Sequence, residues 1–222
     1  LEDGVSRINM KIRSQVESAI NGLGPEISSE AIKKMFDRLD ELQEGDILVL
    51  AGSIPASMPE SMYRDIMKRL ADRKLKIAVD ATKSLLLNVL PFHPFVIKPN
   101  NHELGELFNV KIKSKDQAVE YAKKLQEMGA QNVIVSMAGE GAVFVGDDGS
   151  VFQSEAPKGT VVNSVGAGDS MVAGFLAGYL GEGDYKEAFK LGVCTGSASA
   201  FSEQLATREQ VEAIRNTHHF QF

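Results

Sequence analysis

The sequence predicts an α/β protein built around a mostly parallel sheet. Short apolar runs of about five residues alternate with amphipathic stretches along most of the chain. Polar loops, several of them rich in glycine, follow the apolar runs directly. In parallel sheets, ligands bind outside the carboxyl ends of the strands, so these loops are the expected site. They are Gly52-Ser53, Asp80 to Thr82, Lys98 to Asn100, Ser136 to Gly141 and Ser164 to Asp169.

Composition excludes several classes of function. The chain has 222 residues, 43% hydrophobic and 24% charged, which is ordinary for one or two globular domains. A net charge of −6 argues against a nucleic-acid or membrane-surface partner. No apolar run is long enough for a membrane span. Cys194 is the single cysteine, so no intrachain disulfide can form, and we expect a buried thiol and a cytoplasmic protein.

The first half of the chain begins with alternating apolar and polar residues. Residues 5–12 are predicted to form a strand, with residues 15–20 as its partner. An amphipathic helix is expected from Ser28 to about residue 42, and another over residues 59–73. Residues 46–50 predict a strand between these helices, buried on both faces.

The second half continues the alternation. Strands are predicted over residues 76–80, 95–98 and 133–136, followed by a hairpin of residues 142–145 and 151–154. Helices are predicted over residues 84–90, 101–108, 114–128, 169–180 and 185–203, with a last one from Thr207. The run Thr160 to Val162 predicts one more strand, leading into a turn of small residues.

That turn, Gly166-Ala167-Gly168, carries the strongest chemical signal in the chain. Residues with little side-chain bulk let backbone N–H groups surround an oxyanion, and the helix that follows directs its positive end to the same point. Asp169 would repel an anion unless it took a proton from a hydroxyl that attacks a phosphoryl group. A glycine bend with an Asp helix cap is the plainer alternative.

The segment Val162 to Phe175 as a whole resembles the C-terminal signature of the PfkB carbohydrate kinases. The resemblance implies a ribokinase-like fold of three αβα layers with a small β lid. Residues 5–24 would be the lid portion and residues 25–222 the nucleotide- and sugar-binding domain. In the family, Gly166, Ala167 and Gly168 would form the anion hole, with Asp169 as catalytic base.

Two further strings resemble the nucleotide elements of the family. Lys98-Pro99-Asn100, with Glu103, resembles the motifs that organise Mg²⁺ and the ATP phosphates, the metal being held through water. Ser136 to Gly141 resembles the nucleotide loop, so Ser136, Ala138, Gly139, Glu140 and Gly141 would face ATP. The alternatives are a capped helix start at Asn100 and a plain glycine turn.

Two residues are expected to contact the sugar. Ser53 matches the family's sugar loop, and Arg7 matches a strand of members that phosphorylate an already phosphorylated sugar. A guanidinium can grip a phosphate with two parallel hydrogen bonds. Without such a substrate, Arg7 would be an ordinary exposed residue.

The resemblance implies transfer of the ATP γ-phosphoryl group to the C6 hydroxyl of fructose 1-phosphate, giving fructose 1,6-bisphosphate. Tagatose-6-phosphate kinase activity and an inactive ATP-binding fragment are the alternatives. A dinucleotide-dependent oxidoreductase is disfavoured, because no complete G-x-G-x-x-G follows a strand. Family members carry a segment ahead of Leu1, so we expect this chain alone to bind ATP weakly, to lack turnover, and to form homodimers through the lid.

Overall fold

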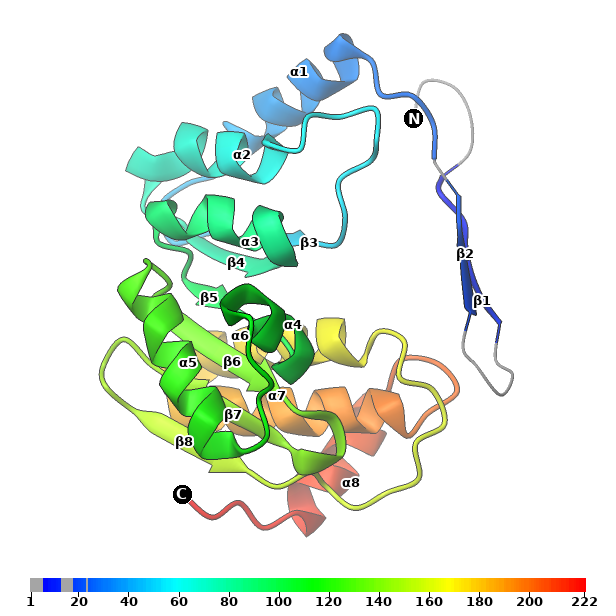
Figure 1. Ribbon diagram of the computed structural model, residues 1–222, viewed down its shortest axis with the longest axis vertical. Coiled ribbons are helices and arrows are strands. Elements are labelled where there is room, and N and C mark those ends of the chain that lie inside the picture. The colour runs from blue at the N-terminus through cyan, green and yellow to red at the C-terminus, as the bar shows by residue number, and fades with distance from the viewer. Residues whose placement is uncertain (1–5, 13–17, 23) are drawn as a thin grey trace.

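Two separate sheets organise the chain. The computed structural model describes residues 6–12, 18–22 and 24–222 (Figure 1). A two-stranded antiparallel ribbon pairs β1 (Asn9–Ile12) with β2 (Ser18–Asn21), and Met10 lies opposite Ile20. The ribbon stands apart from the remaining strands (Figure 1). The predicted pairing is therefore confirmed where the chain is described, whereas residue 5 and residues 15–17 of the predicted strands lie outside the described residues.

The second sheet has six strands in the order in which they occur along the chain. They are β3 (Ile47–Ala51), β4 (Lys76–Asp80), β5 (Val96–Ile97), β6 (Asn132–Ser136), β7 (Ala142–Val145) and β8 (Val151–Ser154). The first four run parallel, and β7 and β8 form the predicted antiparallel hairpin at one edge. This arrangement confirms the mostly parallel sheet.

Helices cover both faces of the larger sheet and give the expected three layers (Figure 1). On one face lie α1 (Ser29–Leu39), α2 (Met62–Leu70), α3 (Lys83–Val89), α4 (Asn101–Phe108) and α5 (Lys115–Glu127). On the other lie α6 (Ala167–Glu182), α7 (Tyr185–Ala200) and α8 (Arg208–Thr217). A short 3₁₀ turn, Ala71–Arg73, completes the predicted helix that α2 begins.

The alternation of side chains along the strands produces two hydrophobic cores. In β4, Ile77 and Val79 belong to the core under the first group of helices, while Ala78 belongs to the core under α6 and α7. Successive side chains of a strand point to opposite faces, so a strand in the middle layer must be apolar throughout. Phe144 and Phe175 fill the second core and are completely buried.

Buried positions include the single cysteine. The Cys194 side chain is fully buried on α7, as expected, and burial raises the pKa of its thiol to about 11.

No helix in the described part of the chain is long and apolar enough to cross a membrane.

The structure corrects two predictions about strands. Residues 160–162 form no strand, and Val161 is 65% exposed. Their neighbours in space are the end of α7, because the amides of Val162 and Asn163 donate to the Ala200 carbonyl. The second correction concerns β3, which is not buried on both faces: Val49 is 46% exposed, and β3 is an edge strand that pairs only with β4 among the described strands.

Helix ends also differ from prediction by a few residues. Helix α6 begins at Ala167 rather than Asp169, because Gly166 adopts the left-handed conformation, with φ of 80°, and serves as N-cap. Helix α7 ends at Ala200, three residues earlier than expected. Helix α4 has the predicted bounds.

Candidate active site

The carboxyl ends of β4 and β5 bring two charged side chains together. Val79 and Ile97 are register partners in the parallel pair, so the residues that follow them, Asp80 and Lys98, are neighbours. The Lys98 side chain is only 7% exposed, and its Nζ lies 3.4 Å from Asp80 Oδ2. The sequence placed Lys98 in the site but did not assign a role to Asp80. The signal for Asp80 is its place at the end of β4, since the register of β4 and β5 makes it a neighbour of Lys98.

The predicted anion turn lies against this ion pair. A Cβ atom added to Gly168 would lie 3.0 Å from Lys98 Nζ, so only glycine leaves normal room for the ammonium group. The first hydrogen bond of α6 runs from the Ser170 amide to the carbonyl of the N-cap, Gly166, at 2.8 Å. First-turn N–H groups of a helix have no partner within the helix, so α6 directs donors to the same region.

Asp169 occupies the first turn of α6 and is exposed. Its charge acts on Asp80: burial raises the pKa of Asp80, the Lys98 ammonium opposes that rise, and the charges of Asp169 and Glu103 add to it. Three charged groups of the carboxyl edge, Lys98, Asp169 and Glu103, therefore act on the Asp80 carboxylate. Such a cluster of charged groups is common at functional sites.

Asn100 and Glu103 form a complete capping box at the start of α4. Asn100 Oδ1 accepts from the amides of His102 and Glu103, both at 2.9 Å, while Glu103 Oε2 accepts from the Asn100 amide at 2.8 Å. The capping alternative is thus present in the structure. Glu103 Oε1 lies outside the capping box and is the carboxylate oxygen that suits a water-mediated Mg²⁺ contact.

Metal binding by protein ligands alone finds no support in the described residues, among which no group of three or more His, Cys, Asp or Glu side chains could hold an ion. Mg²⁺ often keeps several waters and binds through one or two carboxylates together with substrate phosphates. The donor set around Glu103 fits that kind of site.

The loop from Ser136 to Gly141 lies beside the start of α4. Asn100 and Ser136 form an isolated parallel bridge, and the Ser136 amide donates to the Pro99 carbonyl at 3.1 Å. The loop folds back as the Met137 amide donates to the Gly141 carbonyl at 2.8 Å. At Gly141, φ is 91° and an added Cβ would lie 1.9 Å from the Ser154 carbonyl oxygen, so this position requires glycine.

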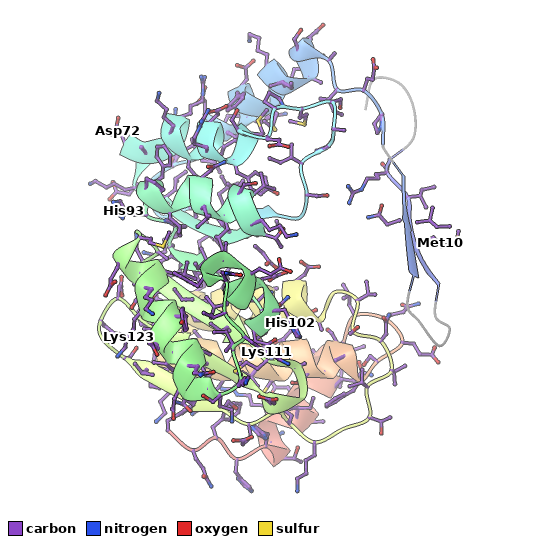
Figure 2. The ribbon with its side chains drawn as sticks, viewed as in Figure 1. Met10, Asp72, His93, His102, Lys111 and Lys123 are labelled. Atoms are coloured by element: carbon purple, nitrogen blue, oxygen red, sulfur yellow. The ribbon has the colours of Figure 1, made fainter. Side chains whose placement is uncertain are left out.

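A cleft of about 1670 Å³ joins these segments. It runs from α4 and the Ser136–Gly141 loop to the start of α6 and the end of α7, and the exposed His102 and Lys111 stand at its edge (Figure 2). The predicted residues that line it are Asn100, Ser136, Ala138, Gly139, Glu140, Gly141, Ala167 and Gly168. Such a volume accommodates a cofactor-sized ligand.

The two residues predicted to contact a sugar also meet. Arg7 Nη1 donates to Ser53 Oγ at 2.8 Å, across 46 positions of sequence, and both residues are exposed. The loop that carries Ser53 is fixed to β4, because the Gly52 amide donates to the Asp80 carbonyl at 3.1 Å. Tyr63, which the sequence did not single out, donates its hydroxyl to the carbonyls of Ala51 and Gly52.

Known proteins resemble this chain over most of its length. The profile described as pfkB family carbohydrate kinase matches residues 6–211. A 1-phosphofructokinase of Bacillus subtilis is 49% identical over 95% of this chain and 69% of its own length. A D-tagatose-1-phosphate kinase of Bacillus licheniformis is 34% identical over 91% and 67%. A Staphylococcus aureus crystal structure, provisionally named a phosphofructokinase, superposes with a TM-score of 0.86 at 38% identity, covering 96% and 69%.

Proposed function

Because this chain belongs to the PfkB family of carbohydrate kinases, phosphotransferases that act on a sugar hydroxyl, we propose that it phosphorylates the C6 hydroxyl of fructose 1-phosphate with ATP. The product is fructose 1,6-bisphosphate. One observation carries the proposal: the glycine turn of α6 approaches the buried Lys98 ammonium, and Asp169 stands in the same turn. Backbone donors, a cation and a carboxylate therefore belong to the same region, the first turn of α6.

In the proposed reaction, Asp169 accepts the proton of the sugar hydroxyl as that oxygen bonds to the γ-phosphorus and the bond from phosphorus to the β-phosphate oxygen breaks. The amides of Gly166 to Asp169 stabilise the charge on the transferring group, since preorganised donors cost no reorganisation during the reaction. When bound with ATP, Mg²⁺ neutralises the triphosphate. Asn100 and Glu103 would hold it, through water.

The remaining cleft residues are assigned to the nucleotide. Ser136, Ala138, Gly139, Glu140 and Gly141 line one wall of the cleft and would lie along ATP. Lys98, whose Nζ lies against Gly168, would contact a phosphate of ATP. The other walls of the cleft are formed by α4, α7 and the loop ahead of α6.

Arg7 and Ser53 are assigned to the phosphorylated sugar. Their hydrogen bond at 2.8 Å places a guanidinium beside a hydroxyl in an exposed position where a phosphate dianion can reach both. The ribbon of residues 5–24 is proposed as a lid over the sugar, and as the surface through which two copies of the chain pair. The exposed Ile8, Met10 and Ile20 give the described part of the ribbon an apolar character that supports the pairing.

The sugar itself is the finer part of the proposal. The matched tagatose kinase is named for tagatose 1-phosphate and not for the 6-phosphate that we expected as the rival. Fructose 1-phosphate and tagatose 1-phosphate differ only in the configuration at C4, and both offer a C6 hydroxyl. The higher identity to the fructose enzyme, 49% against 34%, favours fructose 1-phosphate.

A kinase assay tests the proposal. The chain is supplied with ATP, Mg²⁺ and, in turn, fructose 1-phosphate, tagatose 1-phosphate, tagatose 6-phosphate and fructose 6-phosphate, and ADP release is followed. The same panel is run on a chimera in which this chain is joined to the part of the Bacillus subtilis relative that the match does not cover. We expect ATP binding by the chain and turnover by the chimera, fastest with fructose 1-phosphate. A chain and chimera that bind no ATP would refute the proposal.

A further inference from the structure

Asp80 is a charged group at the carboxyl edge of the sheet to which the proposed reaction gives no task. Its backbone is fixed twice: Asp80 pairs with Ala51 in the β3–β4 register, and its carbonyl accepts from the Gly52 amide at 3.1 Å. Its side chain, 20% exposed, is directed to Lys98. The strand backbone holds the short Asp80 side chain in a defined position, whereas a lysine side chain has four rotatable bonds.

Two features of its surroundings make the position of the Lys98 ammonium depend on a carboxylate held in place. Its side chain is only 7% exposed, and a buried cation is costly unless it is paired. It also lies next to the first turn of α6, where the positive end of the helix dipole disfavours a cation. Among the described side chains, Asp80 is the carboxylate paired with it, at 3.4 Å. Without Asp80, the ammonium would be expected to leave its place beneath the turn.

We propose that Asp80 is a positioning residue, which holds the Lys98 ammonium beneath the first turn of α6 so that it meets the phosphoryl group during transfer. The inference rests on the proposed function. Asp80 itself does not need to touch the substrate. The loop that carries Ser53 follows β3 and is hydrogen-bonded to the Asp80 carbonyl through Gly52, so Asp80 links the position of Lys98 to that of the proposed sugar loop.

The sign of the effect separates positioning from simple electrostatics. Asp80→Asn removes a negative charge close to the anion site. If charge alone mattered, the variant would bind a triphosphate more tightly than the parent. If Asp80 positions Lys98, the variant loses an ordered ammonium contact and binds more weakly. Charge-assisted hydrogen bonds are the strong ones, so a loss of threefold to thirtyfold is expected.

A double-mutant cycle in binding provides the test and needs no turnover. The affinity of the chain for the non-hydrolysable analogue AMP-PNP with Mg²⁺ is measured by calorimetry for the parent, Asp80→Asn, Lys98→Met and the double variant. We expect each single variant to bind more weakly and the double variant to bind no more weakly than Lys98→Met alone. Adenosine, which has no phosphate, should bind equally to all four. Asp40→Asn, which removes another ion-paired carboxylate at the end of α1, is the control.

Each outcome is decisive. Additive losses, or an Asp80→Asn variant that binds AMP-PNP as tightly as the parent, would overturn the role of Asp80 and leave the proposed function standing. A parent that binds no AMP-PNP would refute both. If circular dichroism shows that Asp80→Asn does not fold, Asp80→Glu keeps the charge and moves it by one methylene. That variant should weaken AMP-PNP binding, and unchanged binding would refute the proposal. In the chimera, Asp80→Asn should lower kcat at least tenfold and change the KM for the sugar less than threefold.

Discussion

The residues proposed to bind the nucleotide (the nucleotide side) and those proposed to bind the sugar (the sugar side) are held in place in different ways. The nucleotide side rests on buried and backbone-determined features: a lysine that is 7% exposed, a glycine at φ of 91°, and a capped helix start. The sugar side rests on two exposed side chains, Arg7 and Ser53, joined by one hydrogen bond. Under the proposed function, phosphoryl transfer therefore relies mainly on buried or backbone-determined groups, while sugar recognition relies on exposed side chains. The comparison predicts that substitutions on the first side affect folding or kcat, and substitutions on the second side affect KM.

The largest effect is expected at Asp169. Asp169→Asn removes the proton acceptor and keeps the shape of the side chain, so the chimera should lose on the order of 10²–10⁴ in kcat while its ATP affinity stays within about threefold. Asp72→Asn, an exposed carboxylate on the outer surface (Figure 2), is the matched control. Retention of more than about a tenth of the parent kcat would remove Asp169 from the base role.

Two glycines in one loop sharpen the claim that the nucleotide side is determined by its backbone. Gly141→Ala forces a Cβ to within 1.9 Å of the Ser154 carbonyl oxygen at positive φ, so the free energy of unfolding should fall by about 2–4 kcal/mol. An added Cβ at Gly139 has nothing within 4 Å, so Gly139→Ala should change stability by less than about 0.5 kcal/mol. Urea titrations of both variants measure the difference, and equal effects would contradict the claim.

The sugar side is tested at Arg7. Arg7→Ala removes the guanidinium proposed to hold the existing phosphate, so the KM for fructose 1-phosphate should rise about tenfold or more while that for ATP changes little. Ser53→Ala should raise the same KM by less, because a neutral hydrogen bond is weaker than a charged one. Steady-state kinetics of the chimera supply both numbers. Equal changes for both substrates would return Arg7 to an ordinary surface residue.

The smallest effect is expected at His218, near the C-terminus, which belongs to neither the nucleotide side nor the sugar side. Burial and the neighbouring His219 lower the pKa of His218 below its usual 6.5, against an opposing effect of Glu155, and its Nε2 lies 3.3 Å from Ser154 Oγ. The unfolded chain then binds more protons than the folded one, so stability falls as the pH drops from about 7 through the lowered pKa. We expect a small loss of stability by pH 5, which His218→Gln should reduce. A pH series of urea titrations checks this, and identical pH profiles would refute it.

Features that depend on the local sequence pattern were predicted correctly, whereas features that depend on contacts between distant segments of the chain were not. The bounds of β4 and α4 follow from apolar periodicity and the Asn100 cap, and both were predicted correctly. The strand expected at residues 160–162 has the right residues but no strand beside it, and the exposure of Val49 depends on what flanks β3. Likewise, the Asp80–Lys98 pair appears only when two strands are placed in register.

The predicted site shows the same division. Glycine content identified the turn before α6 and the Ser136–Gly141 loop, because a positive φ or a close approach demands that residue type. The contact of Arg7 with Ser53 spans 46 positions, and no local pattern specifies it. Tyr63 was missed for the same reason: its hydroxyl reaches the sugar loop from α2, which only the packing of that helix determines.

The capping box at the start of α4 has a consequence for how this protein can evolve. Asn100 and Glu103 satisfy the first amides of the helix before any ligand arrives, and the loss of such a cap typically costs about 0.5–2 kcal/mol. If the same two side chains also order the metal's water shell, a substitution there is exposed to selection twice, once through folding and once through turnover. A change of sugar preference has an easier route through Arg7 and Ser53, which the core does not constrain. Lineages that adopt a new sugar are therefore expected to diverge first in the ribbon and the Ser53 loop.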